Sequence, residues 1–360
     1  MSGEIITVAV ALSENPYDVL VGEGLLAKTG ELSKPLLGPR DCAVISDETV
    51  APLHARSVLD SLKSAGFTPH LLTVPAGEAS KSMEVAAGLC DRLIGLGLDR
   101  KGAVFTLGGG VVGDLAGFVA SIHYRGIPVV QLPTTVVAQV DSSVGGKTGV
   151  NSPLGKNLIG TFHQPRLVIA DTATLSTLPE RVFREGLAEV IKHAVIADAS
   201  MLELLPPDSS SDLTQLIARN VAIKASIVAK DEFETSGIRA LLNFGHTVGH
   251  AVEAVAGYGG LAHGEAVAIG MAAALDLSMR LAGLPAEDAG QVISVIKACG
   301  LPVTLPPGLS QQKILSALQR DKKFDRGAIR FVLTSALGSA FVSFSVTLAD
   351  MTGAIDRLGR

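Results

Sequence analysis

Residues 105–114 read F-T-L-G-G-G-V-V-G-D, the pattern from which the architecture of the first half of the chain is predicted. The apolar segment 103–107 predicts a strand, Gly108, Gly109 and Gly110 predict a tight turn, and residues 113–121 predict a helix. Such a turn lets the backbone approach a diphosphate, and the helix start supplies free N–H groups and a positive dipole. The stretch also fits G-x-G-x-x-G, a weak motif that here has the strand and helix it requires. We expect a dinucleotide site; a tight turn without a ligand is the alternative.

Short apolar segments alternate with helical patterns on both sides of this turn. Strands are predicted at residues 5–10, 17–21, 42–46, 70–74, 103–107, 128–132 and 167–170, and helices at 48–65, 81–94 and 113–121. The first two strands are expected to form a hairpin. The others are separated by helices, which is typical of a mostly parallel sheet with helices on its faces. Residues 133–135 and 141–147 are interpreted as loop and turn.

From residue 179 onward the apolar period becomes helical. Helices are predicted at 180–197, 211–231, 239–256, 264–282 and 285–298, then a Pro-rich linker at 302–307, a helix near 311–318, a hairpin of strands 329–333 and 341–344, and a final helix. The sequence thus predicts an α/β fold with an N-terminal Rossmann-like nucleotide-binding domain, residues 1–175. A mostly α-helical metal- and substrate-binding domain, residues 176–360, follows, and we expect the site in the cleft between the two.

Composition excludes several classes of protein. Thirty basic against 35 acidic residues give a net charge of −5, which argues against a nucleic-acid binder. No uncharged apolar run reaches about 18 residues, so no membrane span is expected. The N-terminus lacks the pattern of a signal peptide, and we expect a cytoplasmic protein. The three cysteines are scattered without a C-x-x-C pair, which favours buried structural thiols.

The nucleotide site departs from the usual Rossmann order. An acidic residue is expected at a strand end about 20 residues after the glycine turn, and none stands there. Asp47 instead ends an earlier predicted strand, in I-S-D-E. A carboxylate at that position can hold a ribose hydroxyl, so we expect a nucleotide site with a different strand order.

A second Gly-rich segment, residues 141–157, carries two lysines. Its G-G-K-T partly matches a P-loop, but the position of the first P-loop glycine is Asp141, so the pattern fails and an NTPase is rejected. Lys147 and Lys156 in such a loop still suit phosphate binding.

Histidines and a glutamate in the second half predict a metal site. His246 and His250 are four residues apart, so on a helix they share a face, and a Gly-rich turn precedes His263. Glu189 and Lys192 lie one helical turn apart in E-V-I-K and offer an oxygen ligand and a cation. Taken singly, each histidine fits a buried structural role and Glu189 a surface acid. Together, one Glu and two His leave open positions on Zn²⁺, which is the catalytic arrangement.

The ordered motifs resemble those of the 3-dehydroquinate synthase family, in the sugar phosphate cyclase superfamily. They are P-A-G-E-A-S-K (75–81), G-G-G-V-V-G-D (108–114), P-T-T (133–135), D-S-S-V-G-G-K-T (141–148), P-L-G-K-N-L-I-G (153–160), E-G-L-A-E-V-I-K (185–192), R-A-L-L-N-F-G-H-T-V-G-H (239–250) and H-G-E-A (263–266). The resemblance covers nearly the whole chain. The chain departs from the family pattern twice in the loop before the helix that carries His246. Phe233 stands where a basic residue is expected, and the chain has one additional residue near Ser236.

The resemblance implies the following site residues. Zn²⁺, for which Co²⁺ can substitute, is bound by Glu189, His246 and His263. NAD is contacted by Asp47, Glu78, Lys81, Gly109, Gly110, Val111, Val112, Gly113, Asp114, Thr134, Thr135, Asp141, Lys147, Lys156, Thr174, Leu175, Ser176 and Thr177. The substrate is surrounded by Lys147, Asn157, Lys192, Asn243 and His250, with its carboxylate on Lys224 and Arg239, a closing residue in Lys322 or Lys323, and Arg125 of the partner subunit, which implies a homodimer.

The implied substrate is 3-deoxy-D-arabino-heptulosonate 7-phosphate, a sugar phosphate of the shikimate pathway to chorismate and the aromatic amino acids. Transient oxidation by NAD at C5 acidifies the C6 proton, phosphate is eliminated, the hydride returns, and ring opening with an intramolecular aldol closure gives 3-dehydroquinate. The alternatives are a sister cyclase that acts on glucose 6-phosphate or sedoheptulose 7-phosphate, a metal-dependent polyol dehydrogenase that releases NADH, and a nucleotide-binding regulatory module. Lys224 and Arg239 favour the carboxylated substrate, and an open metal site disfavours a module without catalysis.

Overall fold

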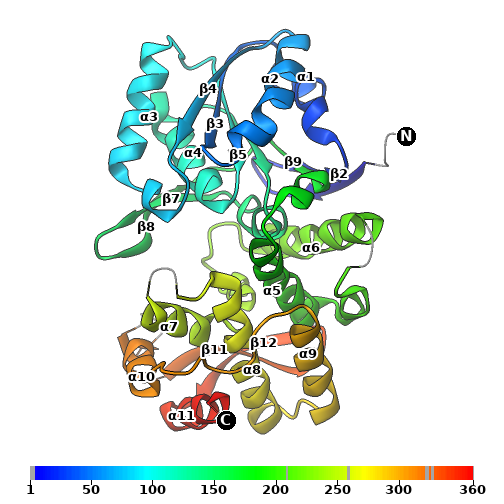
Figure 1. Ribbon diagram of the computed structural model, residues 1–360, viewed down its shortest axis with the longest axis vertical. Coiled ribbons are helices and arrows are strands. Elements are labelled where there is room, and N and C mark those ends of the chain that lie inside the picture. The colour runs from blue at the N-terminus through cyan, green and yellow to red at the C-terminus, as the bar shows by residue number, and fades with distance from the viewer. Residues whose placement is uncertain (1–4, 208–209, 258–259, 321–323, 326–327, 360) are drawn as a thin grey trace. The chain divides into compact units, whose positions relative to one another are not determined.

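The computed structural model describes residues 5–207, 210–257, 260–320, 324–325 and 328–359 (Figure 1). The chain divides into two compact units, Met1–Leu178 with Leu213–Phe233 and Pro179–Asp212 with Glu234–Arg360. The predicted domains, 1–175 and 176–360, stay predictions, because compactness does not test which ranges fold independently.

The first unit is built on a seven-stranded sheet in the order β1-β2-β9-β6-β5-β3-β4. Its strands are β1 (Ile6–Val10), β2 (Tyr17–Gly22), β3 (Asp41–Asp47), β4 (Thr68–Val74), β5 (Ala103–Gly108), β6 (Val129–Pro133) and β9 (Leu167–Asp171). β1 and β2 form the predicted antiparallel hairpin, and the other pairings in this sheet are parallel. The chain forms β3, then β4 outside it, and then β5 on the other side of β3, so the winding direction reverses there. Open α/β sheets bind ligands outside the carboxyl ends of the strands at such a switch point.

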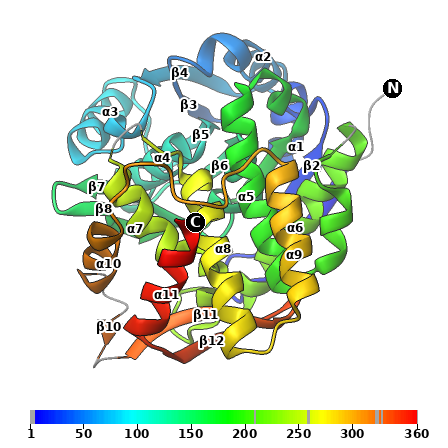
Figure 2. The same cartoon turned by 60° about the horizontal axis from the view of Figure 1, so that its bottom comes forward.

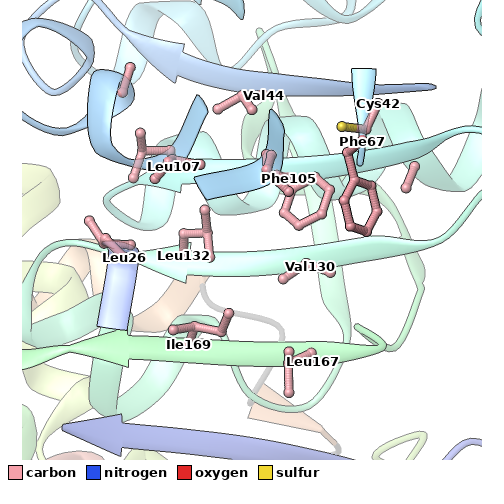
Figure 3. Packing of buried hydrophobic residues seen from close by; sticks show 14 of the residues in the cluster. Leu26, Cys42, Val44, Phe67, Phe105, Leu107, Val130, Leu132, Leu167 and Ile169 are labelled. Carbon is pink, nitrogen blue, oxygen red and sulfur yellow. The ribbon is translucent and has the colours of Figure 1, made fainter. Parts of the chain in front are cut away.

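Helices cover both faces of this sheet. They are α1 (Thr29–Leu37), α2 (Arg56–Ser64), α3 (Met83–Gly95) and α4 (Gly110–Ile122), with the short turns η1 (Leu25–Lys28), η2 (Ala51–Ala55), η3 (Glu78–Ser80), η4 (His123–Arg125), η5 (Ala138–Ser142) and η6 (Thr172–Thr177). Because strand side chains alternate, Phe105 of β5 packs with α1 and α2 on one face, and Val104 packs with α3 and α4 on the other. Figure 3 shows the first of these cores, where Phe105 meets Phe67 edge-on with ring centroids 6.1 Å apart. Both cores contain residues of β3 and β5, the two strands that flank the switch point.

A hairpin that the sequence did not predict follows η5. β7 (Lys147–Ser152) and β8 (Gly155–Phe162) form a separate two-stranded antiparallel sheet. Close pairing needs glycine here, since a Cβ on Gly149 would lie 2.5 Å from the carbonyl oxygen of Ile159. Strand β8 is exposed along almost its whole length, so neither of its faces has to be apolar. Its sequence therefore lacks the alternation of apolar and polar residues by which a strand is predicted.

The second unit is mostly helical. Its elements are α5 (Glu180–Ala197), η7 (Ala199–Leu204), η8 (Ile238–Asn243), α7 (His246–Ala256), α8 (His263–Leu281), α9 (Ala286–Ala298), α10 (Gln311–Arg320), α11 (Leu348–Leu358) and the antiparallel strands β10 (Phe324–Asp325), β11 (Ala328–Ala336) and β12 (Ser339–Val346). Helix α8 contacts α5, α7, α9 and α11 (Figure 2), and most of its residues are buried. The remaining helix, α6 (Ser210–Lys230), lies mostly in the first unit.

The predicted helix 239–256 is interrupted, which corrects the sequence analysis. Residues up to Asn243 form the 3₁₀ turn η8, and α7 begins only at His246. Between them Gly245 has φ 78°, and a Cβ there would lie 2.6 Å from Cγ of Met271. A left-handed residue with no room for a side chain ends the first segment and redirects the second.

Other boundaries also differ from the prediction. Helix 48–65 begins as a turn and the π-turn η2 before α2, the predicted loop 141–147 begins inside η5, and α1 was not predicted. The α/β class itself, with a nucleotide-binding type of sheet and then a mostly helical part, is confirmed. None of the helices in the described part of the chain has the length and apolar character needed to span a bilayer.

We expect Gly270→Ala to destabilise the second unit, because α7 and α8 touch there. A Cβ on Gly270 would lie 1.9 Å from the carbonyl oxygen of Gly245, and backbone cannot yield as a flexible side chain can. Overpacking of this kind costs about 1–3 kcal/mol of the free energy of unfolding, measured by denaturant titration. Gly290→Ala in α9 is the matched control, since nothing lies within 4 Å of that Cβ. Alanine there should stabilise by about 0.5–1 kcal/mol; equal effects of both changes would contradict the packing argument.

Candidate active site

A buried ion pair on α5 is the starting point of the candidate metal centre. Glu189 and Lys192 lie three residues apart on one face of the helix, and Nζ of the lysine contacts Oε2 of the carboxylate. Both side chains are 1% exposed, so loss of either partner would leave an uncompensated buried charge. The second oxygen, Oε1 of Glu189, is buried and accepts no hydrogen bond from the described residues.

Three histidines from α7 and α8 gather near this oxygen. His246 and His263 are the first residues of the two helices, and His250 lies one turn into α7. Gly249 permits the approach of the helices, since a Cβ there would lie 2.9 Å from the carbonyl oxygen of Ala266. One nitrogen from each of the three rings lies within 4.8 Å of the others. Sequence spacing predicted that the two histidines of α7 share a face, and the Gly-rich turn before His263 indicated that this ring can fold back toward them.

The distances from Glu189 suit two ligands of one cation. Oε1 lies 3.4 Å from Nε2 of His246 and 3.5 Å from Nε2 of His263. Ligand atoms about 2.1 Å from a tetrahedral Zn²⁺ lie about 3.4 Å from one another. The donor set of one carboxylate and neutral imidazoles is also the kind that Zn²⁺ and Co²⁺ accept. The residues present therefore fit a catalytic metal of this type.

Hydrogen bonds at the other ring nitrogens turn both Nε2 atoms toward Glu189. Nδ1 of His246 lies 3.2 Å from the carbonyl oxygen of Phe244, and Nδ1 of His263 lies 3.0 Å from Oε2 of Glu253. An imidazole that donates through Nδ1 presents the lone pair of Nε2 to a metal. The same orientation is usual for histidines that bind a metal.

The charges of the centre favour a cation. Burial works against the charged form of Glu189, yet Lys192 and His246 hold the pKa of this carboxyl well below its usual range. Burial lowers the pKa of His246, so that ring is neutral. Burial also opposes the charged form of His263, but the neighbouring carboxylates of Glu189 and Glu253 raise its pKa to about 10. The position of His263 is thus one that prefers positive charge.

One face of α5 holds the start of α8 in place. Arg181 makes two hydrogen bonds to the carboxylate of Glu265, at 2.8 and 2.7 Å, and Glu265 in turn accepts from the backbone N–H of Ala262. One turn along α5, Glu185 meets the backbone N–H of Gly264. The next turn carries Glu189. Contacts at successive turns fix the first residue of α8 against the buried carboxylate.

The glycine turn of the first unit has the form expected of a diphosphate site. Gly109 links β5 to α4 and has extended backbone. A Cβ on it would lie 3.1 Å from Cγ2 of Thr135, so the turn is tightly packed from behind. Gly110, Val111, Val112, Gly113 and Asp114 form the first turns of α4. The N–H of Gly113 donates to the carbonyl oxygen of Gly109 at 3.0 Å, and the N–H groups before it are those that a helix start offers to an anion. Asp47 ends β3, next to β5 at the switch point, and its Oδ1 accepts from the N–H groups of residues 49 and 50.

Two further groups line the carboxyl ends of β6 and β9. The hydroxyl of Thr134, directly after β6, is buried and has no hydrogen-bond partner among the described residues, as is expected of a group that faces a ligand. After β9, Thr174, Leu175, Ser176 and Thr177 form η6. Gln139 ties the two ends together through hydrogen bonds to the carbonyl oxygens of Pro133 and Asp171. These residues fit a polar ligand such as NAD along the edge of the sheet.

A polar network joins α4 to the β7–β8 hairpin. Nζ of Lys81 lies 2.5 Å from Oδ2 of Asp114 and also contacts Oδ1 of Asn157. Asn157 donates its backbone N–H to Asn151 at 2.9 Å, and Asn151 donates to Glu78 at 2.7 Å. Burial raises the pKa of the Asp114 carboxyl, and Lys81 partly offsets this. A predicted substrate residue, Asn157, thus lies within the group predicted for the cofactor.

Lys224 lies in the first unit, on α6. It pairs with Asp141, whose Oδ1 is 2.5 Å from Nζ, and it also contacts the carbonyl oxygen of that residue. Arg239, its predicted companion for a carboxylate, is buried in η8 of the second unit. The two residues predicted to bind one carboxylate thus belong to different units, Lys224 to the first and Arg239 to the second.

The other predicted site residues are placed as follows. Lys147 begins β7 and is exposed, Lys156 lies on exposed β8, Asn243 ends η8, and Arg125 is exposed with a left-handed φ of 67°. Lys322 and Lys323 lie outside the described residues. Sequence reasoning missed Glu253, Glu185 and Asn151. Only Glu253 had a visible signal, because it lies seven residues after His246 and so on the same face of α7.

Comparisons with known proteins agree with this geometry. Two family models match the chain, described as 3-dehydroquinate synthase N-terminal over residues 71–185 and 3-dehydroquinate synthase C-terminal over residues 186–324. The 3-dehydroquinate synthase of Caulobacter vibrioides is 48% identical over 360 residues, which covers 96% of this chain and 97% of that protein.

Solved structures of sister enzymes share the fold. A 2-deoxy-scyllo-inosose synthase complexed with carbaglucose-6-phosphate, NAD⁺ and Co²⁺ matches with a TM-score of 0.89 at 27% identity, over 98% of this chain and all of that one. A 2-epi-5-epi-valiolone synthase from Streptomyces hygroscopicus with NAD⁺ and Zn²⁺ bound matches with a TM-score of 0.86 at 31% identity, over 97% and 98%. Fold is common to all these cyclases, but nearly half of the residues along almost the full length are shared with the first relative. By that measure the chain belongs to the 3-dehydroquinate synthase family.

Proposed function

We propose that this protein is a 3-dehydroquinate synthase that converts 3-deoxy-D-arabino-heptulosonate 7-phosphate to 3-dehydroquinate and phosphate. The observation that carries the proposal is the approach of His246 and His263 to Oε1 of Glu189, at 3.4 and 3.5 Å, in a chain of this family. A buried carboxylate oxygen that accepts no hydrogen bond is costly to desolvate, and a bound cation would compensate that cost.

NAD and Zn²⁺ are the proposed cofactors, with Co²⁺ as a possible substitute. In support, the two sister cyclases named above hold NAD⁺ with Co²⁺ or Zn²⁺. Glu189, His246 and His263 would hold the metal, and the turn after β5, with Asp47 and Thr134, would hold NAD. When bound, NAD supplies a reversible two-electron oxidation of a substrate alcohol, and the metal polarises the hydroxyls of that substrate.

The chain's own residues would bind and orient the substrate. Lys192 keeps Glu189 ionised without competing for Oε1, since it occupies the other oxygen. His250 is exposed beside the two ligand rings, where it can hydrogen-bond a substrate oxygen. Lys147, Asn157, Asn243, Lys224 and Arg239 offer donors for phosphate and carboxylate oxygens. Exclusion of water then protects the transiently reduced cofactor.

The test of the activity is phosphate release from 3-deoxy-D-arabino-heptulosonate 7-phosphate with catalytic NAD⁺ and Zn²⁺, while absorbance at the NADH band is followed. We expect phosphate and 3-dehydroquinate in equal amounts with no build-up of NADH, because the hydride returns in each turnover. A metal chelator should abolish turnover, and added Zn²⁺ or Co²⁺ should restore it. Accumulation of NADH would indicate a polyol dehydrogenase, and turnover only of a sugar phosphate without a carboxylate would indicate a sister cyclase.

Metal binding should release one proton and should therefore weaken as pH falls. The raised pKa of His263, about 10, means that this ring is protonated near neutral pH and must lose its proton to become a ligand. The pKa values of Glu189 and His246 are lowered, so both groups are already deprotonated and release no proton when the metal binds. The Zn²⁺ dissociation constant should rise about tenfold for each pH unit lost between about pH 9 and 7.

Calorimetry in two buffers of different ionisation enthalpy counts the proton directly. His70→Ala, a change on the strand β4 far along the chain from the ligands, should leave the count at the wild-type value. Binding that is independent of pH, with no proton released, would contradict the assignment of His263.

The homodimer and the location in the cytoplasm stay predictions. If Arg125 of the partner subunit completes each site, an inactive Arg125→Ala protein and an inactive His250→Ala protein should complement one another. Mixed dimers contain one intact site, so an equal mixture after exchange of subunits should recover roughly a quarter of wild-type activity. Absence of recovery, with mixed dimers demonstrated by differently tagged chains, would place Arg125 in its own subunit's site or in none.

A further inference from the structure

The second ring nitrogen of His263 has a charged partner that the family resemblance does not include. Nδ1 lies 3.0 Å from Oε2 of Glu253, while Nε2 of the same ring lies 3.5 Å from Oε1 of Glu189. A carboxylate can only accept a hydrogen bond, so Nδ1 must carry the proton. When the ring gives up its other proton to become a ligand, the lone pair of Nε2 is directed toward Glu189 and His246.

The position of Glu253 on α7 is fixed by the same geometry that brings the histidines together. His246, His250 and Glu253 follow one another at intervals of four and three residues, so they form one stripe along the helix. Gly249 and Gly270 hold α7 against α8 at backbone contact, as a Cβ on either would lie within 3.0 Å of the facing backbone. The side chain of Glu253 is 20% exposed, so most of it is buried where it meets His263.

The two ligand histidines differ in this respect. His246 is oriented by a neutral acceptor, the carbonyl oxygen of Phe244 at 3.2 Å, whereas His263 is oriented by a full negative charge. A carboxylate behind an imidazole raises the basicity of the ligand nitrogen and holds the ring against rotation. His263 is only partly buried, whereas His246 is buried. Packing therefore restrains the His263 ring less, and a hydrogen bond that fixes its orientation matters more there.

We propose that Glu253 is a positioning residue of the metal centre, which fixes the tautomer and orientation of His263 and so strengthens the binding of the metal. The inference rests on the metal site of the proposed function and goes beyond it, because it assigns a residue that touches neither metal nor substrate. Partners of this kind contribute about 10- to 100-fold to metal affinity.

The test measures the dissociation constant of Zn²⁺ for the full-length protein by competition with a chromophoric chelator. Glu253→Ala should raise the constant about 10- to 100-fold, and Glu253→Gln should raise it less, because an amide oxygen can still accept from Nδ1. The visible spectrum of the Co²⁺ protein should change for Glu253→Ala, since that spectrum reports ligand geometry. At saturating Zn²⁺ both variants should recover most of the activity.

Glu265→Gln is the matched control. Glu265 also supports the start of α8, through Ala262 and Arg181, but within the described chain its carboxylate makes no hydrogen bond to an imidazole ring. Unfolding temperatures in excess chelator show whether each variant is folded. If Glu265→Gln weakens Zn²⁺ as much as Glu253→Ala, or if Glu253→Ala leaves affinity and spectrum unchanged, the proposal is wrong. Wild-type protein that binds no Zn²⁺ would instead overturn the proposed function itself.

Discussion

The burial of Glu189 is the constraint on which the second unit depends. An ionised carboxylate without solvent costs several kcal/mol unless its oxygens are satisfied, and Lys192 satisfies only one of them. The other oxygen, Oε1, is stabilised only by positive charge placed next to it, where the nitrogens of His246 and His263 lie. The helices α7 and α8 reach that point only because Gly249 and Gly270 allow their backbones to touch. The ion pair on α5 and the glycines on the two other helices are therefore parts of one requirement.

Two electrostatic effects on a bound cation oppose each other at this centre: repulsion by the helix N-termini and attraction by the carboxylates. His246 and His263 are the first residues of α7 and α8, and a helix N-terminus carries about half a positive charge, which repels a metal ion. Two carboxylates, Glu189 and Glu253, lie against these helix starts and outweigh that repulsion. Lys192 then limits the excess of negative charge, so that a single divalent cation fits the balance.

Local sequence predicted what depends on short spacings, and failed where distant packing decides. The glycine turn at Gly108–Gly110 and the pair His246 and His250 were readable because strand, turn and helix follow one another directly. The break at Gly245 was not, since the residue that excludes a side chain there is Met271, on another helix. The exposed strand β8 gave no alternation to read. The contact of Lys224 with Asp141 joins residues 83 positions apart, which local sequence could not indicate.

The choice among four candidate ligands can be argued from burial rather than from spacing. Spacing alone favours His246 with His250, and the three rings form a compact group. Yet His250 is exposed, whereas Glu189 is buried with an oxygen that accepts no hydrogen bond from the described chain. A buried group in that state gains most from a cation, while an exposed imidazole is already solvated and gains least. The balance favours Glu189, His246 and His263 as the ligands, and it places the exposed ring of His250 beside them on the solvent side.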